Sequence, residues 1–402
     1  MKNAALTEIK RWLVSQGLLG RTECEILVGF CEGCRRHGIM ISQGVLFIDT
    51  LHPVLESWGF FWDEDEGVEQ SQQQFLRDNA EENAQIWLRS PFYAMQQAGQ
   101  TELRVSLRGT ETLPFLVLNE LRDEGQTDYF AMIQRLCEVD TIGEMDNLYS
   151  RWSSKSDNGF SEGEVEALRE LLPTLALSIK TAAVRRIAQS LVSVYLGRDP
   201  GRRVLQGRIA RGAVDSIHTV LWFSDMADYT SLSEQVASGE LIGLLNDYSE
   251  AAILSVTKNG GDVLKLIGDG TLAIFNAESP ETAAQSALAA RRELEERLQS
   301  LNRVRWDSGQ VVTSIYLSLH VGEVFYGNIG SCDRLDFTVI GPAVNEVCRI
   351  ASICNEIGRP LVISSAFRSL LPIKDTENFF SAGFHRLKGV RQPMEVYAER
   401  EG

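Results

Sequence analysis

The spacing of apolar positions predicts both helices and strands in the first part of the chain. Residues 4–36 carry an apolar face at helical spacing and predict helices. Apolar runs at residues 45–48, 103–107 and 115–118 predict strands of one antiparallel sheet. The aromatic run at residues 58–62 indicates core packing or, alternatively, the lining of a ligand pocket. These elements predict an α+β N-terminal part.

A long helix is predicted next. Residues 161–164, Ser-Glu-Gly-Glu, have the sequence of a capping box. Apolar residues then recur at helical spacing as far as Val194, and Pro173 is expected to bend the helix. This stripe indicates either a packing seam with a second copy of the chain or a helix packed on its own domain. The basic, glycine-bearing stretch at residues 197–212 is typical of a linker.

From Val220 onward the pattern becomes strand, helix, strand, strand, helix, strand, strand, helix, strand. Capping sequences beginning at Ser231 and Ser279, and the pair Gly341-Pro342, predict the starts of the three helices. The strands are expected at residues 220–223, 263–267, 271–275, 311–319 and 335–340. This order predicts an α+β domain of the ferredoxin-like βαββαβ type with added strands.

Length and composition narrow the class of protein. A chain of 402 residues favours two domains. The net charge of −16 argues against nonspecific binding to nucleic acid or anionic membranes. No apolar run reaches the roughly 20 residues that span a bilayer, and residues 1–20 lack the features of a signal peptide. Seven irregularly spaced cysteines fit reduced thiols. A cytoplasmic protein with no membrane span is therefore expected.

Two aspartates stand at the ends of predicted strands, on either side of a predicted helix. Asp225 follows an apolar run, and Asp269 is the tip of a Gly-Asp-Gly hairpin. A lone aspartate in such a place is usually a turn residue or a helix cap. Two carboxylates that meet in space can share divalent cations, and Mg²⁺ prefers one or two carboxylates plus substrate phosphates. The pair therefore predicts a metal site.

Further polar residues occupy positions where chemistry is expected. Lys265 lies in an otherwise apolar strand, where a lysine is costly unless it faces solvent or a partner. Asn345 and Arg349 are four residues apart on the third helix and share one face. Together they can hold a ribose and a transferring phosphoryl group. The alternative for Arg349 is a surface salt bridge with Glu346 or Glu356.

Several motifs fall in the order found in the class III nucleotidyl cyclases. They are Phe-Ser-Asp-Met-Ala-Asp-Tyr-Thr at residues 223–230, Leu-Ile-Gly-Asp-Gly at 266–270, Phe-Thr-Val-Ile-Gly at 337–341 and Val-Asn-Glu-Val-Cys-Arg at 344–349. Residues 216–397 resemble the catalytic domain of this family. The resemblance implies that the 3′-hydroxyl of ATP attacks the α-phosphorus to give cyclic AMP and pyrophosphate. It also implies sites formed between two catalytic domains of a homodimer.

The resemblance assigns metal and transition-state roles. Asp225 and Asp269 would hold two Mg²⁺ or Mn²⁺ ions per active site, with the backbone carbonyl of Met226 as a further ligand. Asn345 and Arg349 fall in the transition-state motif, where Arg349 would stabilise charge on the pentavalent phosphorus.

The resemblance also assigns residues that contact ATP. Lys265 falls where adenylate cyclases carry a lysine that reads the purine and guanylate cyclases a glutamate, and Thr338 falls at the second base-reading position. A Lys/Thr pair is similar to the subclass that includes bicarbonate-responsive adenylate cyclases. Either Lys388 or Arg391 would reach the triphosphate, and the sequence leaves this choice open.

One departure from the family keeps other functions open. Asp228 stands where the family usually has glycine, in a turn whose amides cradle phosphates. A carboxylate there would repel the triphosphate unless it points away or binds metal. The alternatives to an adenylate cyclase are a guanylate cyclase, against which Lys265 argues, and a catalytically weak nucleotide-binding signalling protein.

The order of sheet and exit helix in the N-terminal part, with residues 159–168, resembles a GAF-type small-molecule sensor domain. We therefore expect a GAF-like sensor domain at residues 1–180, a helical linker at 181–215 and the cyclase domain at 216–402. An unknown small-molecule effector is expected on the sensor domain. The homodimer is expected to form through the catalytic domain and the linker helix.

Overall fold

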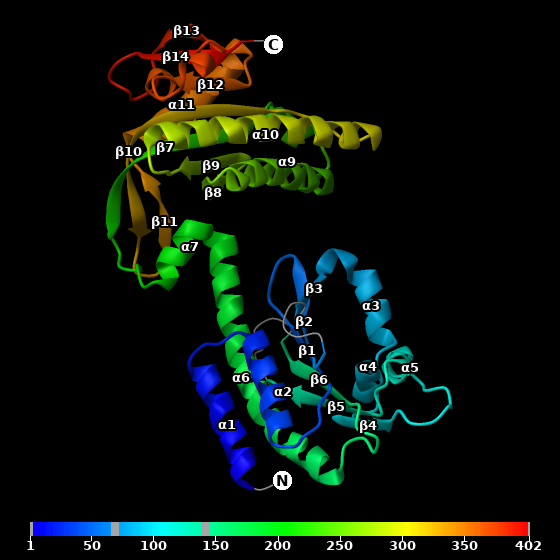
Figure 1. Cartoon of the computed structure of the whole chain (residues 1–402). Helices are drawn as coiled ribbons and strands as arrows, with labels where there is room; N and C mark the ends of the chain where they lie inside the picture. The colour runs from blue at the N-terminus through cyan, green and yellow to red at the C-terminus, as the bar shows by residue number, and fades with distance from the viewer. Residues whose placement is uncertain (1–2, 66–71, 138–144, 401–402) are drawn as a thin grey trace. The chain divides into compact units, whose positions relative to one another are not determined.

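The computed structural model describes residues 3–65, 72–137 and 145–400 (Figure 1). The chain divides into two compact units, residues 1–191 and 192–402, so the division falls within one long helix. The finer limits expected at residues 180 and 215 remain predictions. Within the described ranges, no helix combines the length and the hydropathy needed to cross a membrane.

The first unit contains a six-stranded antiparallel sheet in the order β3-β2-β1-β6-β5-β4. Its strands are β1 (Gln43–Asp49), β2 (Leu55–Asp63), β3 (Gln72–Leu76), β4 (Glu102–Ser106), β5 (Asp128–Arg135) and β6 (Asn147–Ser154). Its helices are α1 (Asn3–Leu18), α2 (Glu23–Arg36), η1 (Arg77–Asn79), α3 (Ala80–Leu88), α4 (Pro91–Gln97), α5 (Leu116–Asp123) and α6 (Glu162–Leu196).

Both faces of this sheet carry a hydrophobic core, because apolar side chains point to both sides of the strands. Leu46 and Trp152 pack with α1, α2 and α6 on one face. Ala131 and Tyr149 pack with α4 and α5 on the other face. The α+β sheet with its helices is compatible with a GAF-like domain, and the GAF resemblance itself remains a prediction.

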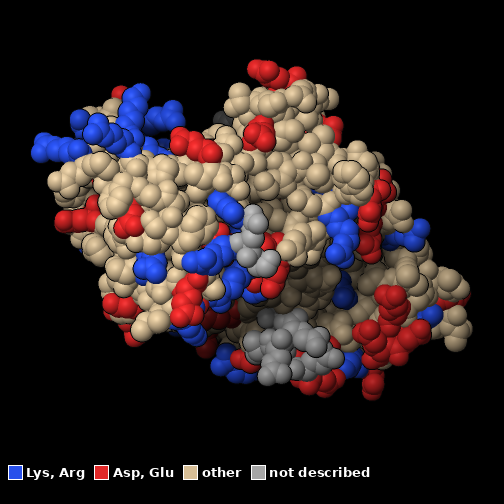
Figure 2. Space-filling model, turned by 90° about the horizontal axis from the view of Figure 1, so that it is seen from above, with Lys and Arg blue, Asp and Glu red and all other residues tan. Residues whose placement is uncertain are grey.

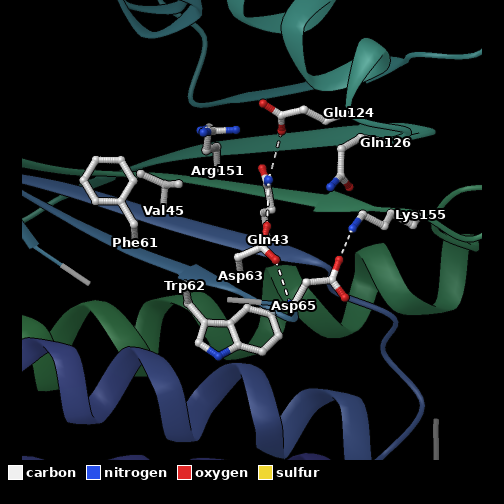
Figure 3. A pocket seen from close by; sticks show the side chains of 10 residues that line it. All are labelled: Gln43, Val45, Phe61, Trp62, Asp63, Asp65, Glu124, Gln126, Arg151 and Lys155. Atoms are coloured by element: carbon white, nitrogen blue, oxygen red, sulfur yellow. Dashed lines mark hydrogen bonds and ion pairs between the residues drawn. The ribbon is translucent and has the colours of Figure 1, made fainter. Parts of the chain in front are cut away.

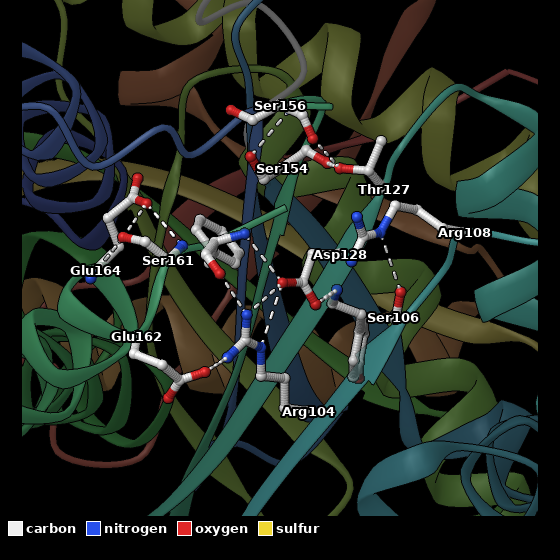
Figure 4. A network of polar contacts seen from close by, with 12 residues as sticks. Arg104, Ser106, Arg108, Thr127, Asp128, Ser154, Ser156, Ser161, Glu162 and Glu164 are labelled. Carbon is white, nitrogen blue, oxygen red and sulfur yellow. Dashed lines mark hydrogen bonds and ion pairs between the residues drawn. The ribbon is translucent and has the colours of Figure 1, made fainter. Parts of the chain in front are cut away.

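A polar network fixes the start of α6 against the sheet (Figure 4). Arg104 of β4 donates to the buried Asp128 of β5 at 2.9 and 3.2 Å and to Glu162 at 2.6 Å. Asp128 also accepts from the backbone N–H of Phe160 at 2.9 Å. The predicted capping box forms as well, since Ser161 and Glu164 bond each other's backbone N–H. Sequence and structure therefore agree on where α6 begins.

The second unit contains an eight-stranded sheet. Its strands are β7 (Val214–Met226), β8 (Asp262–Ile267), β9 (Gly270–Phe275), β10 (Ile315–Gly330), β11 (Leu335–Ile340), β12 (Leu361–Ser364), β13 (Phe379–His385) and β14 (Met394–Glu399). Its helices are α7 (Arg198–Leu205), α8 (Tyr229–Gln235), α9 (Ser238–Lys258), α10 (Pro280–Asp307), α11 (Pro342–Ile357), α12 (Ser365–Arg368) and α13 (Ile373–Thr376).

The strand order of this sheet is β13-β14-β12-β10-β7-β9-β8, and β11 pairs with β10. The central order β10-β7-β9-β8 is antiparallel throughout. With α9 between β7 and β8 and α10 between β9 and β10, it confirms the predicted ferredoxin-like βαββαβ plan. Trp222 packs with α9 and α10 on one face. Leu221 packs with α11 on the other.

Three local predictions were wrong. Residues 115–118 were expected as a strand, but α5 begins at Leu116 and buries Leu118 and Leu121. The capping sequence at Ser231 does not open the long helix, because α8 ends at Gln235 and α9 begins at Ser238. The strand expected from residue 311 begins at Ile315. Apart from these three, the helix α7 lies within residues 181–215, where a helical linker was expected.

Charged side chains of both signs gather on the face of the molecule that Figure 2 shows. The net charge of −16 therefore does not correspond to a uniformly acidic surface.

Candidate active site

The register of the sheet brings Asp225 and Asp269 together. Asp225 is the last but one residue of β7, and Asp269 lies in the turn between β8 and β9. Because β9 pairs with β7, with Thr271 opposite Ser224, the turn lies beside the end of β7. The backbone N–H of Met226 donates to Oδ2 of Asp269 at 3.2 Å. The predicted meeting of the two strand-end aspartates therefore occurs within one chain.

The two carboxylates disfavour each other's charge. Burial, followed by hydrogen bonding to Asp269 and the charge of Asp269, raises the pKa of Asp225 to about 7. Within the described residues, no third His, Cys, Asp or Glu joins them to complete a metal-binding group. Two adjacent hard oxygen donors under mutual repulsion fit a divalent cation whose other ligands come from backbone carbonyls, water or a substrate phosphate.

A cavity of about 590 Å³ opens on this pair. Asp228 and Glu234 line it with the two aspartates, and α11 contributes Cys348, Ser352 and Asn355. In the described part of the chain, no lysine or arginine lines it. Four carboxylates without a basic side chain attract cations and repel a free triphosphate. A phosphate-bearing substrate therefore needs positive charge from elsewhere.

Asp228 adopts the backbone conformation that the family's usual glycine would favour. Its φ of 55° is left-handed, and no other described residue except glycines has a positive φ. Aspartate tolerates this conformation better than most residues. The exposed side chain lines the acidic cavity and begins α8. The departure noted in the sequence thus preserves the shape of the turn and changes its charge.

The predicted base-reading residues lie on two strands, β8 and β11, that are not paired with each other in the sheet. Lys265 of β8 forms an ion pair with Asp336 of β11, and both side chains are about half exposed. Asp336 and Thr338 lie two residues apart, so they share the partly exposed face of β11. Lys265, Asp336 and Thr338 therefore form one polar group. Asp336 was not predicted as a site residue from the sequence. Its position two residues before Thr338 on a predicted strand could have indicated it, because such residues share a face.

The predicted transition-state residues share a face of α11, as their spacing indicates. Asn345 is exposed, and Arg349 is half-buried. Nη1 of Arg349 is buried and has no hydrogen-bond partner among the described residues. The alternative salt bridge between Arg349 and Glu346 is not formed, because Glu346 instead contacts Nε2 of His320 at 3.0 Å. Arg349 therefore does not form the salt bridge with Glu346 that the alternative supposed.

The two residues predicted to reach the triphosphate lie in a loop that passes close to Arg349. Lys388 and Arg391 are exposed in the loop between β13 and β14. The same loop contains Gly389, where a β-carbon would lie 3.4 Å from Nη1 of Arg349. None of these residues lines the acidic cavity, and neither do Asn345, Lys265 and Thr338. Within one chain, the acidic cavity is therefore lined by none of the predicted basic and base-reading residues.

Comparison with known proteins agrees with this fold. Residues 214–398 match the model of the adenylate and guanylate cyclase catalytic domain. This part of the chain is therefore a class III adenylate/guanylate cyclase catalytic domain, as the motifs indicated.

The chain is also similar to curated relatives and to a solved structure. The chain is 25% identical over 236 residues to adenylate cyclase 1 of Rhizobium meliloti (strain 1021), which covers 58% of this chain and 33% of the relative. It is 29% identical over 155 residues to the adenylate cyclase of Anabaena cylindrica, covering 39% of this chain and 31% of the relative. The chain thus spans about a third of the length of these relatives. The adenylyl cyclase CyaB from P. aeruginosa aligns at 25% identity and a TM-score of 0.42, over 47% of this chain and 96% of that chain.

Proposed function

We propose that the chain is an adenylate cyclase that converts ATP to 3′,5′-cyclic AMP and pyrophosphate at sites shared between two copies of the catalytic domain. The observation that carries the proposal is the separation of charge within one chain. All the charged side chains that line the cavity at Asp225 and Asp269, among the described residues, are acidic, whereas Arg349 and the residues near it lie outside that cavity. Pairing two copies in a homodimer brings each acidic cavity a basic partner.

Adenine is the base that the polar group on β8 and β11 favours. The ammonium of Lys265 only donates hydrogen bonds, which suits the N1 acceptor of adenine and not the N1–H of guanine. Thr338 lies on the same face of β11 as the partner of Lys265. The curated relatives named above are adenylate cyclases, which supports the same choice.

The residues of the site have distinct roles in this proposal. Asp225 and Asp269, with the carbonyl of Met226, would hold divalent cations, Mg²⁺ or Mn²⁺, two per active site. When bound, such ions supply activation of a hydroxyl nucleophile and neutralisation of phosphate charge. Asn345 orients the ribose, and Arg349 stabilises charge on the α-phosphoryl group. Lys388 or Arg391 binds the triphosphate. The N-terminal unit and α6 would pass an effector signal to this site.

The test is cyclic AMP formation from ATP by the purified full chain, with Mg²⁺ and with Mn²⁺, beside the same assay with GTP. We expect cyclic AMP as the main product. Asp225→Ala and Asp269→Ala should each lower the rate by at least about a hundredfold, because each removes a metal ligand at a strand end. Circular dichroism should match the parent chain.

Either of two results would exclude this function. One is cyclic GMP formed faster than cyclic AMP. The other is turnover that is unchanged in both alanine variants at saturating Mg²⁺.

A further inference from the structure

One cavity in the N-terminal unit contains polar groups that the chain itself does not satisfy. It has a volume of about 470 Å³ and lies on the face of the sheet that also carries α4 and α5 (Figure 3). Cross-strand neighbours Phe61, Val45 and Arg151 form one row of its floor. Gln43 and Asp63 are paired in the next row, and Gln126 and Glu124 come from the segment after α5.

Unpaired donors gather at this cavity. Nη1 of Arg151 and Nε2 of Gln126 are buried without a hydrogen-bond partner in the described residues. The hydroxyls of Tyr129 and Ser153, which face each other across β5 and β6, are also unpartnered there. Gln126 is only 2% exposed, so its amide cannot turn to bulk water. Buried polar atoms in native proteins are nearly always bonded. Tyr129 and Ser153 do not line the cavity, but the two donors that do, on Arg151 and Gln126, point to a missing acceptor.

Negative charge at the same cavity is also uncompensated. Asp63 and Glu124 both accept from Nε2 of Gln43, at 2.8 and 3.1 Å. Asp63 also accepts from the backbone N–H of Asp65 at 2.8 Å. The donors to these two carboxylates are thus neutral, and neither carboxylate forms an ion pair with a described residue. Lys155 forms its ion pair with Asp65, at 2.5 Å, and not with Asp63 or Glu124, although the charge of Asp63 contributes to raising the pKa of Lys155. Arg151, likewise, forms no ion pair within the described ranges. A positive and a negative group therefore face the cavity, each without a partner.

We propose that this cavity binds a small zwitterion, an α-amino acid with an apolar side chain. Its carboxylate would accept from Arg151 and Gln126, and its ammonium would donate to Asp63 and Glu124. Val45 and Phe61 provide an apolar wall for the side chain. Phosphate fits less well, because its charge would lie beside two carboxylates. The proposal concerns binding by the N-terminal unit and does not depend on cyclase activity.

The test is calorimetric titration of the full chain with single apolar amino acids, from alanine to phenylalanine. For leucine, the matched probes are isocaproate, which lacks the ammonium, and isoamylamine, which lacks the carboxylate. We expect saturable binding of at least one amino acid and binding of its two truncated analogues that is about tenfold weaker or more, because each loses a charge-assisted contact. No binding of any amino acid, or tighter binding of inorganic phosphate, would overturn the proposal.

Variants separate the two ends of the ligand. Arg151→Met should abolish binding of both leucine and isocaproate, whereas Arg135→Met, at an exposed position of the same sheet, should leave both unchanged. Glu124→Gln should weaken leucine about tenfold and leave isocaproate unchanged. Glu124 is exposed beyond the end of α5, so this variant remains informative if Arg151→Met does not fold. If leucine bound the Glu124→Gln variant and the parent chain with equal affinity, the proposed site for the ammonium group would be contradicted.

Discussion

Single residues on β8 and β11 select the base in the proposed reaction. In Lys265→Glu, the new carboxylate would face the N1 acceptor of adenine, so the two groups cannot form a hydrogen bond. The substitution should lower kcat/KM for ATP by about tenfold or more. Adding Thr338→Cys should improve GTP relative to ATP. The measurement is kcat/KM for both nucleotides, with Lys374→Glu, an exposed lysine on α13, as the matched charge control. An unchanged ATP/GTP ratio in Lys265→Glu would mean that these residues do not contact the base.

Asp228 offers a second test at the residue scale, because its backbone and its charge can be separated. Asp228→Asn keeps a residue that tolerates a left-handed φ and removes the carboxylate. It should lower KM for ATP by up to about fivefold, since exposed charges interact by about 1 kcal/mol or less. Asp228→Gly should lower KM equally. An effect of the glycine variant alone would assign the cause to the backbone.

At the scale of elements, one strand pairing creates the site. Asp225 and Asp269 meet because β9 lies beside β7 and its hairpin turn reaches the end of β7. The sequence predicted this arrangement, since the apolar runs on both sides of Gly268-Asp269-Gly270 indicate a hairpin. It did not predict α5, because a four-residue apolar run has no periodicity that separates a strand from a helix. The break between α8 and α9 was missed for a related reason: Ser231 occurs in a sequence that suits a cap but lies within the shorter helix.

The contact between α11 and β10 predicts a pH dependence of stability. The buried His320 of β10 bonds the carboxylate of Glu346 and lowers the pKa of Glu346 below its ordinary value of 4.5. A carboxyl group whose pKa is lowered by folding stabilises the fold above its unfolded pKa, and this contribution is lost as the pH falls through the folded pKa. Glu346 therefore stabilises the domain at neutral pH and ceases to do so in acid.

Glu346→Gln measures this contribution. At neutral pH, the variant should melt about 2–4 °C below the parent chain, for a loss of about 1 kcal/mol. As the pH falls below 4.5 and through the lowered pKa of Glu346, the two melting temperatures should converge, because the parent then loses the same contribution. Differential scanning calorimetry across this pH range gives both values. A constant difference in melting temperature at every pH would show that the carboxylate charge contributes nothing.

At the scale of the whole molecule, the chain keeps two complementary groups apart. The acidic cavity contains Asp225, Met226 and Asp269, and the other predicted site residues lie outside it. The sequence identified residues of both groups because each belongs to a short motif with fixed spacing. It could not show that Asp336 pairs with Lys265, nor that burial and Asp269 raise the pKa of Asp225 to about 7. Those properties depend on neighbours that are distant in the chain.

The measurement that tests the shared site most directly is complementation between two inactive variants. Asp225→Ala homodimers lack a metal ligand in both sites, and Arg349→Ala homodimers lack the transition-state arginine in both. In a mixed dimer, one site carries both substitutions and the other carries neither. Equal co-expression makes about half the dimers mixed, so about a quarter of the parent activity should return.

Asp225→Ala paired with Asp269→Ala is the control and should show no recovery. Each chain supplies the aspartates of one site, so each site of this mixed dimer lacks one metal ligand. The readout is cyclic AMP formed by heterodimers isolated through two different tags. Recovery of about a quarter of the parent rate in the unfractionated mixture, or about half in the isolated heterodimers, is the predicted result. Confirmed heterodimers of Asp225→Ala and Arg349→Ala that form no cyclic AMP would contradict a site shared between two chains.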